Sequence, residues 1–189
     1  AAVNLEQLFD LAPHGPDVFV GEGHEYPWGG LFGGHIVGQA LRAAAYTVSS
    51  ELLPHSLRAY FIRRGDNTQP VRYEVDRIRD GKSFTTRRVV ARQQDGAILN
   101  LEASFQVLED SVNEQYVHPQ PNLPLPESIE ESSWSTFLER RTIPVTQLNS
   151  VNRIGTGYVA SWFRAKDLPP GNELLNRCAI AYLSDDLPN

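Results

Sequence analysis

The sequence is poor in cysteine, lacks methionine and contains no long run of apolar residues. With Cys178 alone, no disulfide can form within the chain and no cluster of thiolates can bind a metal, as is typical of proteins from the reducing cytosol. The apolar run at residues 179–183 is far shorter than the roughly 18 residues that a membrane-spanning helix needs. The N-terminus has no basic segment followed by an apolar one, so we expect neither a membrane span nor a secretory signal.

Positive charge is also scarce, because 17 Lys and Arg residues stand against 23 Asp and Glu residues and give a formal net charge of -6. Phosphate binding requires an excess of basic residues, so we expect no nucleic acid partner. The five histidines are scattered without the spacing of metal ligands, and we expect no metal site. A hydrophobic fraction of 41% over 189 residues is enough for a soluble, globular fold with a sizeable core.

Residues 33–48, GGHIVGQALRAAAYTV, predict a helix with one buried face. The apolar positions recur at helical spacing, at Ile36, Val37, Ala40, Leu41, Ala44 and Val48. Other positions, such as Gly38 and Ala43, are small, so a neighbouring backbone can approach this helix closely.

Strands are predicted after this helix. Residues 71–78 and 99–107 alternate between apolar and polar side chains, which is typical of half-buried strands. Residues 83–92 lie between them, and the Asp80-Gly81 and Asp95-Gly96 pairs are strong hairpin signals. With a further strand at 55–65, we expect an α+β fold in which an antiparallel sheet wraps around the helix.

The second part of the chain repeats the order of the first. Residues 109–145 are rich in Pro, Glu, Ser and Asn and are predicted to be a linker. A strand at 157–165 then leads through a Pro-Pro-Gly turn into a helix from about Asn172. We therefore expect a first domain at 1–108 and, at 146–189, the start of a second copy that is incomplete in this sequence.

Gly33 and Gly34 stand where the first helix begins. Backbone N–H groups at a helix N-terminus bind anions or polarise a carbonyl, and glycine gives a ligand access to them, although a tight turn would also use glycine. His35 and His55 are candidate acids or bases, and each is alternatively a structural hydrogen-bonding residue.

Asp185 shares a largely apolar helical face with Cys178 and Tyr182, and Asp186 falls near Ala179. A carboxylate in such a setting is either hydrogen-bonded structurally or positions water, unless the helix end is simply at the surface.

Basic residues concentrate in two segments and could bind a polyanionic ligand or form a solvated sheet face. They are Arg63, Arg64, Lys82, Arg87 and Arg88. Alternation places Arg87 and Arg88 on opposite faces of the sheet.

Five blocks in register resemble one family. They are LFGGHIVGQAL (31–41), PHSLRAYFIRRGD (54–66), YEVDRIRDGKSFTTRRVVARQ (73–93), ASFQ (103–106) and AYLSD (181–185). Together they resemble the acyl-CoA thioesterase II family, whose members are double hotdog proteins of bacteria and peroxisomes. The resemblance implies a tandem hotdog fold, with an antiparallel sheet around a central helix in each copy, and hydrolysis of fatty acyl-CoA to free fatty acid and CoA.

By the same resemblance, Asp185, rather than Asp186, is the family's water-orienting Asp, and a Ser or Thr and a Gln would follow beyond Asn189. Their absence and the lack of methionine lead us to expect that residues are missing from this sequence. The predicted substrate-binding residues are Gly33, Gly34, His35, Arg63, Lys82, Ser83, Phe84 and Arg88. No cofactor is expected, because coenzyme A is part of the substrate. Pairing of hotdog units predicts a homo-oligomer, cytoplasmic in a bacterium or peroxisomal in a eukaryote.

Two alternatives remain open from the sequence. A hotdog dehydratase or hydratase would act on the same thioesters through acid-base chemistry, with His55 or His35 as the important group. A non-catalytic module would bind acyl-CoA without turnover.

Overall fold

The computed structural model describes residues 3–112, 114, 123–148 and 159–186. The chain divides into two compact units. One comprises Ala1–Leu108 and Asp167–Asp186, and the other comprises Glu109–Lys166 and Leu187–Asn189. Among the described residues, every helix is too short or too polar to cross a lipid bilayer.

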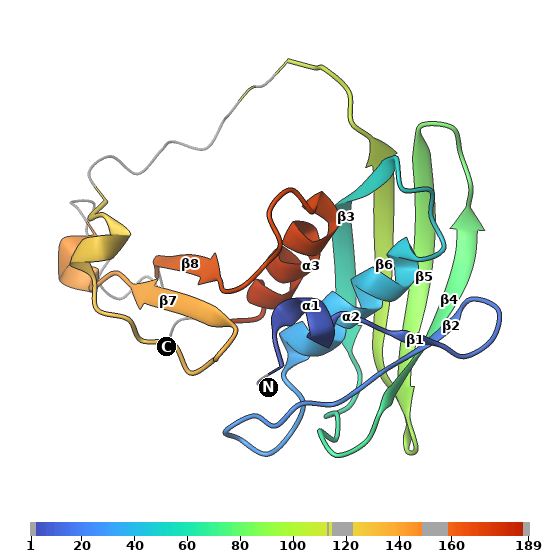
Figure 1. Cartoon of the computed structure of the whole chain (residues 1–189), viewed down its shortest axis with the longest axis horizontal. Helices are drawn as coiled ribbons and strands as arrows, with labels where there is room; N and C mark the ends of the chain where they lie inside the picture. Colours follow the sequence, from blue (N-terminus) through green and yellow to red (C-terminus); the bar gives the residue numbers. More distant parts are fainter. Residues whose placement is uncertain (1–2, 113, 115–122, 149–158, 187–189) are drawn as a thin grey trace. The chain divides into compact units, whose positions relative to one another are not determined.

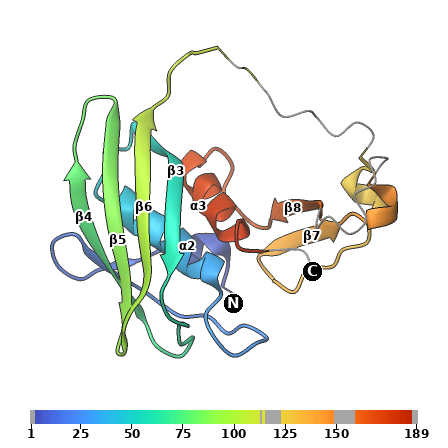
Figure 2. The same cartoon turned by 180° about the vertical axis from the view of Figure 1, so that it is seen from behind.

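The larger unit is an antiparallel sheet with helices against one face (Figures 1 and 2). Its elements are α1 (Leu5–Leu8), β1 (Ala12–Pro13), β2 (Val18–Gly21), α2 (Gly33–Ala45), β3 (Leu52–Phe61), β4 (Val71–Arg79), β5 (Phe84–Gln93), β6 (Gly96–Val107) and α3 (Glu173–Leu183). The sheet has six strands in the order β1-β2-β4-β5-β6-β3, and β3 is therefore an edge strand. The predicted α+β architecture, a sheet around a helix, is confirmed.

The alternating strands bury their apolar residues on one face. In β4, Val71 and Tyr73 are buried while Arg72 is exposed, as the period of two requires. The β5–β6 hairpin turns at Asp95 and Gly96. Gly96 has a φ of 108°, which residues with a side chain rarely adopt. The Asp95-Gly96 hairpin signal therefore reflects a backbone conformation that favours glycine.

Helix α2 is buried on almost every side, and not on one face as the sequence pattern predicted. The sheet covers one side of α2, and α3 packs against another. Glycines in α2 allow α3 to pack this closely. A Cβ added to Gly34 would lie 2.0 Å from the Tyr182 carbonyl oxygen, and one added to Gly38 would lie 3.3 Å from the Cys178 carbonyl oxygen. These two contacts run in opposite directions along the helices, so α2 and α3 are antiparallel.

Helix α3 begins where the sequence predicted. The Asn172 side chain caps it by accepting a hydrogen bond from the Leu175 N–H at 3.1 Å. Cys178 is fully buried against α2, and burial raises the pKa of its thiol to about 12. A thiol that stays protonated is a poor nucleophile, so Cys178 serves packing.

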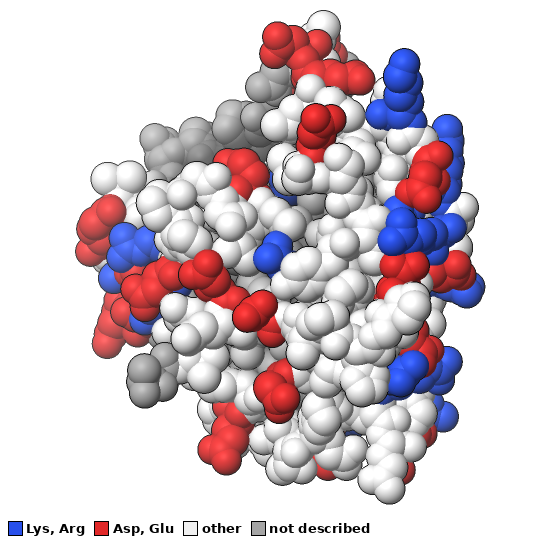
Figure 3. Space-filling model, turned by 45° about the vertical axis from the view of Figure 1, so that its right-hand side comes forward, with Lys and Arg blue, Asp and Glu red and all other residues white. Residues whose placement is uncertain are grey.

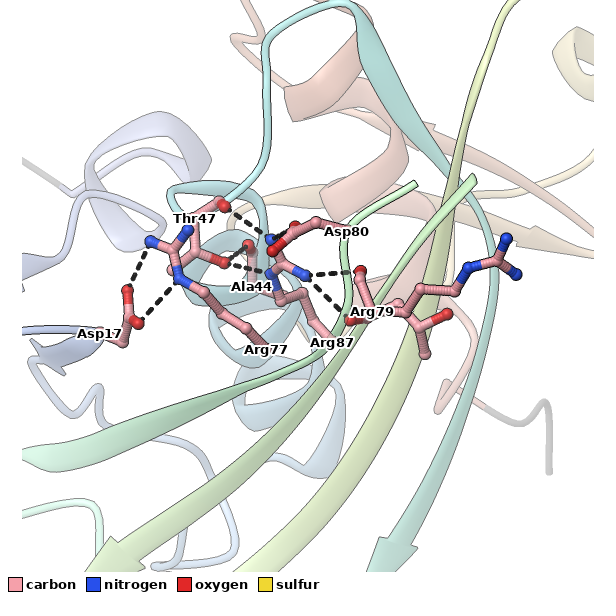
Figure 4. A network of polar contacts seen from close by, with 8 residues as sticks. Asp17, Ala44, Thr47, Arg77, Arg79, Asp80 and Arg87 are labelled. Carbon is pink, nitrogen blue, oxygen red and sulfur yellow. Dashed lines mark hydrogen bonds and ion pairs between the residues drawn. The ribbon is translucent and has the colours of Figure 1, made fainter. Parts of the chain in front are cut away.

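Arg87 lies inside the larger unit, whereas its neighbour Arg88 points to solvent, which confirms that the two occupy opposite faces. The Arg87 guanidinium donates to the Thr47 hydroxyl at 2.7 Å and to the Thr47 carbonyl at 2.9 Å, and it pairs with Asp80 (Figure 4). A buried cation requires such partners. Arg87 therefore joins the end of α2 to the β4–β5 hairpin and is not free for a ligand.

The smaller unit contains a strand pair, and the first strand of this pair lies within the segment 109–145 that the composition predicted to be a linker. Its described elements are η1 (Pro126–Ser128), β7 (Leu138–Thr142), η2 (Val145–Gln147) and β8 (Ser161–Ala165), with β7 and β8 antiparallel. Glu139 forms an ion pair with Arg164 across this ladder and another with Arg141 on its own strand. The first residues of the strand predicted at 157–165 lie outside the described residues. Strand β8 and helix α3 belong to different units by their contacts. The expected domain boundaries, at 1–108, 109–145 and 146–189, stay a prediction.

Candidate active site

Asp185 lies where α3 ends and α2 begins. One of its carboxylate oxygens, Oδ2, accepts a hydrogen bond of 3.0 Å from the Gly34 N–H in the first turn of α2. The residue that precedes α2, Phe32, gives no side-chain cap, so a carboxylate from the turn after α3 takes that role. The positive end of the α2 dipole favours a negative charge at this position. The α2 N-terminus therefore binds a carboxylate of the protein itself at the Gly34 N–H, and the ligand contact expected there stays a prediction.

Asp185 is half-buried, and burial raises the pKa of its carboxyl above the ordinary value. The Gly34 N–H lowers this pKa and the neighbouring Asp186 raises it, both by less than the effect of burial. A carboxylate with a raised pKa is a better proton acceptor than one in water, which suits a group that binds and orients water.

A cleft of about 350 Å³ opens in front of Asp185. Its lining combines this carboxylate, two arginines, two glycines and four apolar residues: Leu31, Gly33, Ile36, Phe61, Ile62, Arg63, Arg64, Gly65 and Asp185. The packing against Asp185 is close, because a Cβ added to Gly33 would lie 2.4 Å from its Oδ2 atom. The structure thus brings together Gly33, Gly34, Arg63 and Asp185 from the predicted set.

The two arginines follow β3 directly and are held by backbone carbonyls. Arg63 donates to the Ala97 carbonyl at 2.7 Å, and Arg64 donates to the Trp28 carbonyl at 2.7 Å. Both residues are exposed. A guanidinium has five N–H donors, so one carbonyl contact leaves each side chain able to bind an anion at the cleft.

His55 lies elsewhere, near the other end of β3 and about 20 Å along the strand from Phe61 at the usual rise per residue. It is exposed, its Nε2 atom is 2.8 Å from the Ser104 hydroxyl, and its ring meets the edge of Phe84 at 5.9 Å. His55 lines a second groove, of about 480 Å³, between β3 and α3. This groove extends along α3 to Ser184, next to Asp185.

Lys82, Ser83, Phe84 and Arg88 lie outside the cleft that holds Asp185. Lys82 and Ser83 are in the β4–β5 turn, and Phe84 begins β5. Arg88 forms an ion pair of 2.8 Å with Asp76 on the outer face of the sheet, where basic and acidic side chains alternate (Figure 3, right side). That face therefore carries charges of both signs. The two arginines at the cleft are better placed than Arg88 to bind a polyanion.

His35 is fully buried in α2, not at the mouth of a ligand site. Its Nδ1 atom is 2.9 Å from the Tyr26 hydroxyl, and the Tyr26 ring packs against Phe32, which in turn packs against Tyr182. Burial lowers the pKa of His35 to about 4, so the imidazole is neutral at physiological pH.

Sequence reasoning missed Phe61 and Ile62, which line the cleft although they are largely exposed. A signal was present, because FIRR places bulky apolar residues directly before two arginines where a strand ends. Tyr26 gave no such signal, since only the folded loop brings it to His35.

Comparison with known proteins places these features in a family. Residues 24–106 match the family model described as the acyl-CoA thioesterase N-terminal domain. Acyl-coenzyme A thioesterase 8 of Homo sapiens is 42% identical over 209 residues, which covers 97% of this chain and 65% of that protein. The chain therefore spans about two thirds of the length of this relative.

Two solved structures are similar over nearly the whole chain. Acyl-CoA thioesterase II TesB2 of Mycobacterium marinum is 34% identical with a TM-score of 0.78, covering 96% of this chain and 66% of that one. The TesB protein of Mycobacterium avium subs paratuberculosis is 33% identical with a TM-score of 0.78, covering 96% of this chain and 68% of that one. This chain, with its hotdog sheet around α2, belongs to the acyl-CoA thioesterase II family.

Proposed function

We propose that the full-length protein hydrolyses fatty acyl-CoA to a free fatty acid and CoA, with Asp185 as the residue that orients and activates water. The position of the Asp185 carboxylate carries this proposal. It is held by the Gly34 N–H, it faces a cleft, and burial makes it a stronger base than an exposed aspartate.

In the proposed reaction, a water molecule hydrogen-bonded to Asp185 attacks the thioester carbonyl carbon. The new C–O bond forms as the carboxylate accepts a proton from the water, and the C–S bond then breaks. The sulfur leaves as CoA and takes up that proton, so Asp185 is regenerated as a carboxylate. A Ser or Thr and a Gln, implied by the family resemblance beyond Asn189, would help to hold the water.

Thiol release from a fatty acyl-CoA by the full-length protein tests this function directly. Stoichiometric appearance of free thiol and fatty acid supports it. Addition of water to a 2-enoyl-CoA without thiol release would identify a hydratase instead, and binding without turnover would identify a carrier module. No observation favours His55 chemistry, because His55 is outside the cleft that contains Asp185.

We propose further that Arg63 and Arg64 bind phosphate groups of coenzyme A. Replacing Arg63 by Gln should raise KM by about tenfold, because a charge-assisted hydrogen bond contributes about 1.5–3 kcal/mol, and should change kcat less. Added salt should also raise the KM of the wild-type protein by screening. Steady-state kinetics with Arg88→Gln as control check this prediction. Arg88 already pairs with Asp76 outside the cleft, so equal KM changes in both variants would contradict it.

The pH dependence should report the raised pKa of Asp185. The active form is the carboxylate, so kcat should be full above this pKa and fall as the pH decreases through it, at a higher pH than the ordinary Asp value of about 3.9. A pH profile of kcat, with circular dichroism confirming the fold at each pH, measures this decrease at low pH. Asp66→Asn is a suitable control, because Asp66 is exposed and its hydrogen bonds lower its pKa. An acid limb at or below the ordinary value would exclude Asp185 as the titrating group.

The compartment and the assembly also belong to this proposal. We expect the protein to act in the cytoplasm of a bacterium or in the peroxisome of a eukaryote, and to pair as a homo-oligomer. Localisation of a tagged full-length protein and its mass by light scattering test the two expectations.

A further inference from the structure

A buried chain of polar side chains connects three segments of the larger unit. The Tyr26 hydroxyl is 2.9 Å from the His35 Nδ1 atom and 3.4 Å from the Tyr182 hydroxyl. Tyr26 is in the loop before α2, His35 is in the first turn of α2, and Tyr182 is in the last turn of α3. All three side chains are buried, with exposed fractions of 7%, 0% and 0%.

The chain borders the contact that holds the candidate catalytic carboxylate. His35 directly follows Gly34, whose N–H binds Asp185, and Tyr182 precedes Asp185 by about one helical turn. The Tyr182 carbonyl is also the nearest atom to the position that a Cβ of Gly34 would occupy. A change in the distance between His35 and Tyr182 would therefore change the Asp185–Gly34 contact.

Aromatic packing fixes the middle of the chain. The Tyr26 ring stacks on Trp28 with centroids 5.3 Å apart and an interplanar angle of 8°. Phe32, which precedes α2, meets the edge of Tyr182 at 4.9 Å. These rings hold the Tyr26 hydroxyl between the two helices. Its contacts with His35 and Tyr182 can therefore keep the distance between α2 and α3 constant.

We propose that Tyr26, His35 and Tyr182 are positioning residues that set the spacing of α2 and α3 and thereby place the Asp185 carboxylate for reaction. This inference rests on the proposed function for its effect on turnover, but the placement of Asp185 can be measured without it. None of the three residues lines the cleft, so they act through Gly34 and Asp185 and do not contact substrate there.

Tyr73 supplies a matched control. It is fully buried, and its hydroxyl donates to the Gln39 side chain of α2 at 2.7 Å, about one helical turn after His35. Tyr26→Phe and Tyr73→Phe each delete one buried hydroxyl that contacts α2. The first leaves His35 and Tyr182 without this partner and the second leaves Gln39 without it, so both should lose stability. Only Tyr26 also reaches α3.

In the full-length protein, Tyr26→Phe should lower kcat by about tenfold with KM nearly unchanged, because small displacements of a catalytic group reduce the rate strongly. Tyr73→Phe should keep kcat within about twofold. Equal losses of kcat in the two variants, or no loss in either, would show that the chain only stabilises the fold. If Tyr26→Phe does not fold, Tyr182→Phe replaces it, because it removes the same contact from the other side.

The carboxyl pKa of Asp185, followed by NMR, is a readout that needs no turnover. Weakening of the Gly34 contact should raise this pKa in Tyr26→Phe and leave it unchanged in Tyr73→Phe. A kcat too low to measure in the wild-type protein would refute the proposed function while this titration still decides the positioning role. An Asp185 pKa that is the same in the wild type and Tyr26→Phe would overturn the inference.

Discussion

Replacement of Asp185 by asparagine should lower the kcat of the full-length protein by about 100-fold or more, the scale of a lost general base. Asparagine keeps the shape of the side chain and can still accept the Gly34 hydrogen bond through its amide oxygen. It cannot accept a proton from water, so the loss should fall on kcat and leave KM nearly unchanged. Steady-state thioester hydrolysis, with unfolding measured in parallel, gives the result.

Asp186→Asn is the matched control, because the two carboxylates are adjacent in sequence but differ in placement. Asp186 is buried, with 7% of its surface exposed, and is not part of the cleft lining. Its replacement should reduce stability more than turnover. If Asp186→Asn abolished activity in a folded protein while Asp185→Asn remained active, the assignment of Asp185 would be wrong.

Gly34→Ala should destabilise the protein by about 3 kcal/mol, within the range of costs for overpacking a closely packed core. The added Cβ would lie 2.0 Å from the Tyr182 carbonyl oxygen, and a backbone atom cannot move aside as a side chain can. Helix propensity predicts the opposite sign, since alanine is favoured over glycine inside a helix by about 1 kcal/mol. Denaturant unfolding therefore separates the two effects.

Gly38→Ala is the comparison for this variant. At Gly38 the nearest atom to an added Cβ belongs to the Phe9 ring, at 2.6 Å, and the nearest backbone atom is 3.3 Å away. The ring can adjust, so this variant should lose less stability than Gly34→Ala. An unchanged or increased stability of Gly34→Ala would contradict the close packing of α2 and α3.

Periodicity in the sequence predicted the parts of the fold that local chemistry determines. The alternation of Val71, Tyr73 and Val75 gave the buried face of β4 correctly, because one side of an antiparallel sheet covers the core. Helical offsets placed Asp185 on the face of α3 that carries Tyr182, and this face packs against α2. The resemblance to the thioesterase family, and not this placement, singled out Asp185 as the water-orienting carboxylate.

Features that depend on distant partners were not predictable in this way. Strand β7 lies in a segment of linker-like composition and is stabilised by Glu139 between two arginines, which no local pattern reveals. Arg87 looked like a candidate ligand for an anion, but Thr47 and Asp80 make it a buried structural residue. The second buried face of α2 required α3, which is more than 100 residues away in the sequence.

Oxygen-18 tracing in a single turnover tests the central claim, that Asp185 activates water, most directly. Full-length protein in excess over a fatty acyl-CoA is allowed to react once in oxygen-18 water, and the fatty acid and the peptide containing Asp185 are analysed by mass spectrometry. Attack by water on the thioester carbonyl predicts one heavy oxygen in the fatty acid and none in Asp185. An unlabelled fatty acid together with a labelled Asp185 would show that the carboxylate attacks the substrate itself, and would contradict the account.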